Sequence, residues 1–145
     1  FDAHSLALFK KRLLNCPRYK LKYKPDAKDA AVLVPLCVVN HKPSILFTVR
    51  NLNMRVHRGE VSFPGGKTDE TDSSTEFTAL REAQEEIGVD PTSIDILGRF
   101  STLPNKDGSL KVHPYVGFIK DEVNLTNFNQ EEVHDVFTVP VDYLL

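Results

Sequence analysis

The chain has 145 residues, of which 41% are hydrophobic and 26% charged, as is typical of a single soluble globular domain. Its 18 basic and 20 acidic residues leave a formal net charge of −2, which gives no reason to expect nucleic-acid or membrane binding. No apolar run reaches the ~18–20 residues of a membrane span, and two cysteines are too few for a disulfide framework, so we expect an intracellular protein. Because the first residue is Phe1, we expect a single domain over residues 1–145 that has been trimmed at one or both ends.

The first half of the chain predicts a helix followed by strands. Apolar residues at helical spacing, ending before Pro17, indicate the helix, and the basic stretch after it is expected to be a surface connector. Two apolar runs joined by turn residues indicate a strand hairpin. The expected bounds are 5–14 for the helix, 17–29 for the connector, and 30–39, 45–50 and 61–63 for the strands.

The second half predicts a central helix between strands. After a glycine-containing turn at 64–66, one of Ser73, Ser74 and Thr75 is expected to cap a helix that reaches residue 87, where Gly88 stops it. Because strands occur in hairpins as well as around helices, we expect an α/β fold with a mixed sheet and helices on both faces. The remaining elements are expected at 94–103, 112–119 and 136–139 (strands), at 129–134 (a short helix) and from residue 140 onward (a last helix).

Three glutamates cluster near the end of the helix predicted over 74–87. Glu82, Glu85 and Glu86 stand at i, i+3 and i+4, so their carboxylates are expected to converge on one face. Like charges at this spacing destabilise a helix by ~0.2–0.5 kcal/mol per pair, and the C-terminal end of the helix dipole adds to the cost. A bound cation explains the cluster better than a solvated face does. The opposite, core-facing side is expected to hold Phe77, Leu80, Ala83, Gln84 and Ile87.

Such a cluster predicts a particular chemistry. Carboxylate oxygens suit hard ions, so Mg²⁺ or Mn²⁺ is the expected cofactor. Mg²⁺ binds substrate phosphates and activates water, which indicates hydrolysis of a phosphate–phosphate bond with one glutamate as the base. Gly65 and Gly66 offer bare backbone where a phosphate or a metal must approach closely, and Arg81 can brace the carboxylates from the side.

These residues resemble the signature of the Nudix hydrolase family, G-x5-E-x7-R-E-U-x-E-E-x-G-U, where U is a bulky aliphatic residue. Residues 81–89 read R-E-A-Q-E-E-I-G-V and match every fixed position. Counted from Gly66, the expected glutamate is Asp72, and eight residues rather than seven separate it from Arg81, which we interpret as a one-residue insertion. The resemblance implies a Nudix α/β/α sandwich with a mixed β-sheet. It implies metal binding by Glu82, Glu85, Glu86 and Gly66, and catalytic roles for Arg81, Glu82 and Glu85, with Glu82 doubling as the base.

A second resemblance narrows the substrate. Residues 46–66 match the spacing of L-L-T-x-R-[SA]-x3-R-x3-G-x3-F-P-G-G, a pattern of the coenzyme A pyrophosphatase branch, with Phe47 and Asn51 as the two departures. This implies hydrolysis of coenzyme A or acyl-CoA at the diphosphate, giving 3′,5′-ADP and (acyl-)4′-phosphopantetheine. The separate 3′-phosphate calls for cations beyond the metal. The expected substrate-binding residues are Arg50, Arg55, Arg58, Lys67 and Gly65, with His57 as a further candidate cation.

Several alternatives stay open from the sequence. The alternative substrate is another nucleoside diphosphate derivative, such as ADP-ribose, NADH or an oxidised nucleotide, and the alternative class is a non-catalytic nucleotide-binding module. Glu132 is either a further carboxylate at the site or a capping residue. The branch includes peroxisomal and mitochondrial enzymes, so the resemblance implies one of these compartments. We expect a small-molecule partner, no nucleic acid and no membrane, and a homodimer stays open.

Overall fold

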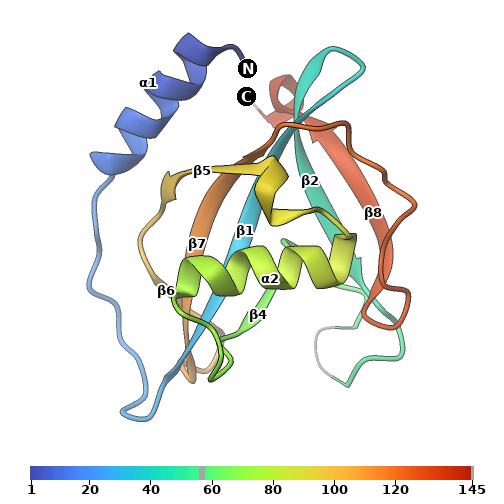
Figure 1. Ribbon diagram of the computed structural model, residues 1–145. Helices are drawn as coiled ribbons and strands as arrows, with labels where there is room; N and C mark the ends of the chain where they lie inside the picture. Colours follow the sequence, from blue (N-terminus) through green and yellow to red (C-terminus); the bar gives the residue numbers. More distant parts are fainter. Residues whose placement is uncertain (56–57, 145) are drawn as a thin grey trace.

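The computed structural model describes residues 1–55 and 58–144, which form one mixed sheet flanked by helices (Figure 1). The long strands are β1 (Lys28–Val39), β2 (Lys42–Arg50), β7 (Leu110–Ile119) and β8 (Val133–Pro140). The short strands are β3 (Val61–Ser62), β4 (Gly65–Lys67), β5 (Ile94–Arg99) and β6 (Leu103–Pro104). The helices are α1 (Ala3–Leu14) and α2 (Thr75–Ile87), with 3₁₀ turns η1 (Pro91–Ser93) and η2 (Val141–Leu144).

Strand β1 is the centre of the sheet. It pairs in parallel with β7 over nearly its whole length and antiparallel with β2 near its end, which confirms the mixed sheet and the predicted hairpin. The first half of β1 also pairs antiparallel with β4, so the glycine segment, expected to be a turn, is a strand. Strand β8 extends the sheet by pairing with β2.

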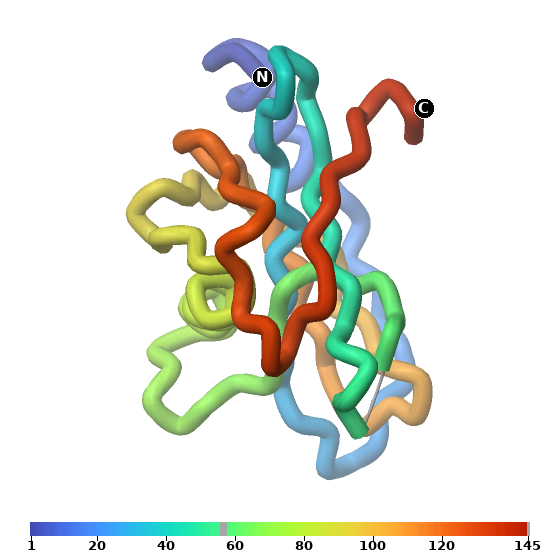
Figure 2. The backbone as a smooth tube through the Cα atoms, turned by 90° about the vertical axis from the view of Figure 1, so that its right-hand side faces the viewer, coloured from blue at the N-terminus to red at the C-terminus, as the bar shows by residue number. Residues whose placement is uncertain are grey.

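Each face of the sheet carries one hydrophobic core under one helix, as predicted. Alternate residues of a strand point to opposite faces, so Leu33 packs with α2 residues such as Ala83, whereas Leu36 packs with Leu13 of α1. Figure 2 shows α2 on one side of the sheet and the chain that follows α1 on the other. Among the helices within the described ranges, none is long and apolar enough to cross a membrane.

Two further sequence predictions about elements were wrong. The strand expected over 94–103 is broken into β5 and β6 around Ser101, whose hydroxyl accepts the Tyr19 N–H from the chain after α1. The helix expected over 129–134 is a turn in which Val133 N–H bonds the Asn129 carbonyl at 2.8 Å, and β8 begins at Val133. The helix expected from residue 140 onward is present in the described residues as the 3₁₀ turn η2.

Helix α2 has the predicted ends, and its buried face is partly the predicted one. Ser74 accepts a hydrogen bond from Phe77 N–H at 3.1 Å, and Gly88 ends the helix with a left-handed φ of 69°. Ala83 and Ile87 are buried as expected. Phe77, however, is 46% exposed and Gln84 is exposed, whereas Ala79, which was not expected inside, is fully buried. The two alanines let the helix backbone approach β1 closely, which turns the larger Phe77 outward.

Candidate functional site

The glycines of β4 lie directly beneath α2. A Cβ at Gly66 would lie 2.6 Å from Glu82 Oε1, so the absence of a side chain makes room for this carboxylate. A Cβ at Gly65 would lie 2.3 Å from the Ala31 carbonyl oxygen, so this glycine is required by the β1–β4 pairing itself. The two neighbouring glycines therefore serve different purposes, one for the site and one for the fold.

Glu86 is a buried acid that faces β4 and β2. It is 1% exposed, its Oε2 accepts the Gly65 N–H at 2.8 Å, and Arg50 Nη1 lies 3.5 Å from its Oε1. Burial raises the pKa of Glu86 to about 8, although the Gly65 hydrogen bond opposes the shift and the Glu82 charge adds to it. A charged Glu86 is therefore costly in the protein alone, and a cation beside it would lower that cost.

Glu82 and Glu132 place more negative charge near Glu86. Burial raises the pKa of Glu82, and the neighbouring Glu85 and Glu132 charges raise it further, against the lowering effect of Arg81. Glu132 acts on the pKa of Glu86 in the same direction. The turn before β8 holds Glu132 here, since its carbonyl accepts the Asn51 N–H at 2.9 Å. The sequence signal for Glu132 was weak because 80 residues of chain separate Asn51 from this turn.

Asp72 and Arg81 form a close ion pair that the irregular sequence motif left in doubt. Arg81 Nε and Nη2 donate to the two Asp72 oxygens at 2.8 and 2.9 Å, and the Thr78 hydroxyl donates to Oδ2 at 2.9 Å. The Asp72 side chain is fully buried, and the Arg81 guanidinium holds its pKa well below the usual range. The extra residue in the loop thus does not prevent the acid from reaching the arginine.

Arg81 also contacts the glutamates of its own helix. Its Nη1 lies 3.1 Å from Glu82 Oε1 and 3.2 Å from Glu85 Oε1. The hydrogen bond with Asp72, followed by these two glutamates, raises the pKa of Arg81. Glu85 is half exposed, while Glu86 is buried on the sheet side, so the carboxylates of one helix face differ widely in exposure. In the ranges 1–55 and 58–144, no three His, Cys, Asp or Glu side chains already form a metal-ion cage.

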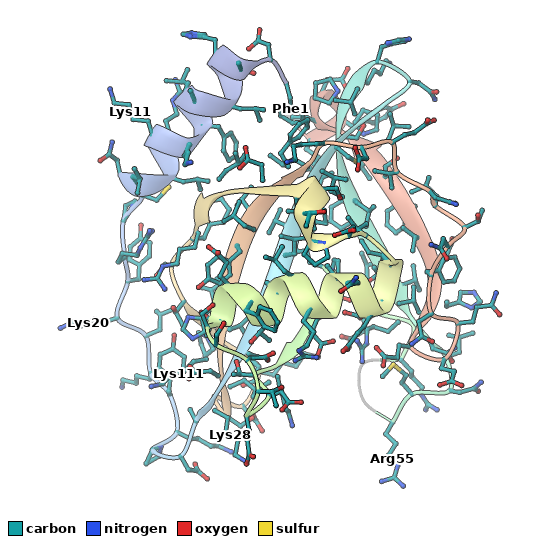
Figure 3. All side chains as sticks on the ribbon, viewed as in Figure 1. Phe1, Lys11, Lys20, Lys28, Arg55 and Lys111 are labelled. Atoms are coloured by element: carbon teal, nitrogen blue, oxygen red, sulfur yellow. The ribbon has the colours of Figure 1, made fainter. Side chains whose placement is uncertain are left out.

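The predicted substrate-binding cations fall into two groups. Arg50 belongs to the site, and its buried Nε has no hydrogen-bond partner within the described part of the chain. Arg55, Arg58 and Lys67 are exposed side chains, and within the described ranges none of them pairs with Glu82, Glu85 or Glu86. Figure 3 shows Arg55 projecting away from α2 at the lower edge of the molecule. His57 lies outside the described residues.

The donor set of this site fits a hard divalent cation. Glu82 and Glu86 provide carboxylate oxygens whose pKa values are raised by burial and mutual repulsion, and Gly66 leaves the space in front of Glu82 free of a Cβ. Oxygen ligands of this kind are those that Mg²⁺ and Mn²⁺ prefer.

The arrangement of sheet and helices defines the class of protein. The structure is similar to that of a Caenorhabditis elegans Ap4A hydrolase, with a TM-score of 0.64, 18% identity, and 81% of this chain and 83% of that chain covered. At the sequence level, the NUDIX domain model matches residues 27–145. The chain therefore belongs to the Nudix family.

Two curated relatives are similar over most of this chain. Nudix hydrolase 3 of Caenorhabditis elegans is 43% identical over 143 residues, which cover 94% of this chain and 59% of the relative. The peroxisomal coenzyme A diphosphatase NUDT7 of Mus musculus is 42% identical over 115 residues, which cover 79% of this chain and 48% of the relative. The chain thus spans about half to three fifths of the length of these two proteins.

Proposed function

We propose that the protein is a Mg²⁺- or Mn²⁺-dependent diphosphatase that hydrolyses coenzyme A or acyl-CoA to 3′,5′-ADP and (acyl-)4′-phosphopantetheine. The proposal rests on the contact between two glutamates of α2 and the two glycines of β4. Gly66 leaves room for the Glu82 carboxylate, and Gly65 N–H donates to Glu86. Two acids of raised pKa, held beside bare backbone, are suited to a cation and the phosphate that accompanies it.

Each residue of the site has a proposed role. Glu82, Glu85 and Glu86, together with the Gly66 backbone, hold the metal. When bound, the metal neutralises phosphate charge and lowers the pKa of a water molecule. Glu82 would accept a proton from that water as the general base. Glu132, whose charge reaches both other glutamates, is the alternative base.

Arg81 is proposed to act mainly through the carboxylates it touches. Asp72 fixes one side of the Arg81 guanidinium group, and Nη1 on the other side donates to Glu82 and Glu85. This arrangement limits the positions that the two glutamates adopt. Arg81 is therefore a positioning residue in the free protein.

The coenzyme A specificity is supported by a sequence pattern and by a relative. The pattern of residues 46–66 places Arg50 and Arg55 at fixed spacing before the glycines, and the mouse relative of 42% identity is named a coenzyme A diphosphatase. We propose that Arg50, Arg55, Arg58, Lys67 and the Gly65 backbone contact the substrate phosphates. By the same resemblance we propose a peroxisomal or mitochondrial location, which a fluorescent tag on the full-length protein tests.

The decisive experiment compares substrates. Coenzyme A, acetyl-CoA, dephospho-coenzyme A, NADH, ADP-ribose and an oxidised deoxynucleotide are incubated with the protein, with and without Mg²⁺, and the products are separated. We expect the highest kcat/KM for coenzyme A or its thioester. A higher value for NADH, ADP-ribose or the nucleotide refutes the substrate, and metal binding without any turnover indicates a binding module instead.

Two sets of variants test the residues. Glu82→Gln and Glu86→Gln are expected to lose about 10²-fold or more in kcat, whereas Glu76→Gln, an exposed acid on the same helix, serves as the control. Arg55→Gln is expected to raise KM for coenzyme A but not for dephospho-coenzyme A, which lacks the 3′-phosphate. Equal KM changes for both substrates would show that Arg55 does not bind that phosphate.

A further inference from the structure

The positive and negative charges of the chain are distributed very unevenly along the sequence, although the net charge is small. Residues 10–28 hold eight basic residues and one acid, Asp26, which gives this segment a formal charge of +7. Since the whole chain carries −2, the rest of it carries −9. The basic residues are Lys10, Lys11, Arg12, Arg18, Lys20, Lys22, Lys24 and Lys28. We call residues 10–28 the basic strap.

The backbone of the basic strap is fixed to the sheet while its charges face outward. Tyr19 N–H donates to Ser101 Oγ at 2.9 Å, Lys24 N–H to the Gly108 carbonyl at 2.9 Å, and Lys28 N–H to the Ser109 carbonyl at 3.0 Å. All eight basic side chains are exposed. Lys20 and Lys22 make no ion pair among the residues that the structure describes. Figure 3 shows Lys11 and Lys20 projecting outward on the same side of the molecule.

Large apolar side chains are exposed on the same strap. Leu14 is 74% exposed, Tyr19 64% and Leu21 41%. None of them is needed for the core under α1, which uses Leu13 and residues packed against it. Between residues 18 and 24, basic residues alternate with Tyr19, Leu21 and Tyr23. Basic and apolar residues intermixed on one surface are typical of segments that lie on anionic membranes.

We propose that the basic strap docks on a lipid bilayer rich in anionic phospholipids. Its lysines contact the headgroups, and its leucines and Tyr19 enter the interface between headgroups and acyl chains. This revises the expectation of no membrane binding, which rested on net charge alone. The strap lies across the sheet from α2 and almost entirely before the first residue matched by the family model, so docking leaves the glutamate site uncovered.

The side-chain types favour a bilayer over a nucleic acid. Bases stack on aromatic rings and arginine planes, whereas six of the eight basic residues here are lysines. The ring of Tyr23 is already covered by Lys111, whose Nζ lies 5.7 Å from the ring centroid. Leu14 and Leu21 have no stacking surface, but they gain free energy by leaving water for the membrane interface.

The test is co-sedimentation of the protein with vesicles. Parent protein is mixed with vesicles of phosphatidylcholine alone or with 30 mol% phosphatidylserine, roughly the composition range that gives a marked surface potential, in low and high salt. Lys20→Gln/Lys22→Gln removes two charges, and Lys42→Gln/Lys120→Gln, at exposed positions outside the strap, is the matched control. Leu14→Ser/Leu21→Ser keeps the charge but removes the apolar contact. A fluorescent single-stranded oligonucleotide is the competing ligand.

Each outcome decides the proposal. We expect binding only to the anionic vesicles, weakened by high salt and reduced up to about 25-fold by the two strap charges, at about fivefold per cation. The serine pair should also weaken binding, and the control pair should not. The proposal is overturned if the protein does not bind anionic vesicles, if it binds neutral vesicles equally well, or if the control pair loses as much binding as the strap pair. It is also overturned if the protein binds the oligonucleotide more tightly than the vesicles and the serine pair leaves that binding unchanged.

Discussion

The charge of Glu86 is expected to lower the stability of the metal-free protein, so Glu86→Gln should stabilise it. Glutamine has nearly the same shape and still accepts the Gly65 N–H, but it carries no charge into a site that is 1% exposed. The variant removes the repulsion with Glu82 as well. It is therefore expected to lose metal-dependent activity and to gain stability when metal is absent.

The pKa of Glu86 sets the size and the pH range of this effect. Its rise from 4.5 to about 8 corresponds to an upper limit of about 5 kcal/mol. Because the folded pKa is raised, the protonated Glu86 contributes fully to the stability of the parent below the unfolded pKa near 4.5. This contribution is lost as pH rises through the folded pKa of about 8. Since the variant also loses a charge-assisted contact with Arg50, we expect a net gain of about 2 kcal/mol at pH 9 and almost none at pH 4.5.

Urea unfolding in EDTA at pH 4.5, 7 and 9 measures the effect. Glu76→Gln is the control, because this exposed glutamate lies on the same helix and is not one of the proposed metal ligands. Mg²⁺ should stabilise the parent and the control more than Glu86→Gln. The reasoning is refuted if Glu86→Gln is less stable than the parent at pH 9 in EDTA, or if its stability falls with pH as steeply as that of the parent.

Three further predictions concern the neighbours of this site. Asp72→Asn should lower Tm by several degrees at pH 7, with the difference closing only below about pH 4, because the depressed pKa makes the Asp72 contribution available above its unfolded value; thermal unfolding across pH checks this, and an unchanged Tm contradicts it. Gly66→Ala should displace Glu82 and weaken Mn²⁺ binding with little change in circular dichroism, whereas Gly65→Ala should unfold the protein at lower urea, because its Cβ meets backbone; the opposite pattern would show that the two glycines are misassigned. Phe77→Ala should cost no more than about 1 kcal/mol in urea unfolding, because this ring is 46% exposed, and a cost above ~3 kcal/mol, as for a core phenylalanine, would restore the buried face predicted from sequence.

Local chemistry in the sequence predicted the elements that depend on neighbours along the chain. A cap at one of residues 73–75 and the stop at Gly88 follow from hydrogen bonds and backbone freedom within a few residues. The structure confirms both and selects Ser74 as the cap. The hairpin of β1 and β2 follows in the same way from two apolar runs joined by turn residues. The glutamate motif on α2, read with the glycines before it, was enough to indicate the Nudix family, which the family match over residues 27–145 confirms.

Only the tertiary structure decided which face of α2 is buried and how the acids are arranged. Helical spacing correctly placed Ala83 inside, but it also placed Phe77 inside and all three glutamates outside. Packing on β1 buries Ala79 and Glu86 and leaves Phe77 exposed. A polar group is buried at low cost only where a hydrogen-bonding or charged partner is present. The partners of Glu86 are Gly65 of β4 and Arg50 of β2, which lie 21 and 36 residues earlier in the chain. Spacing along one helix carries no information about such partners, which is why the sequence predicted the glutamates and the fold determined their separate environments.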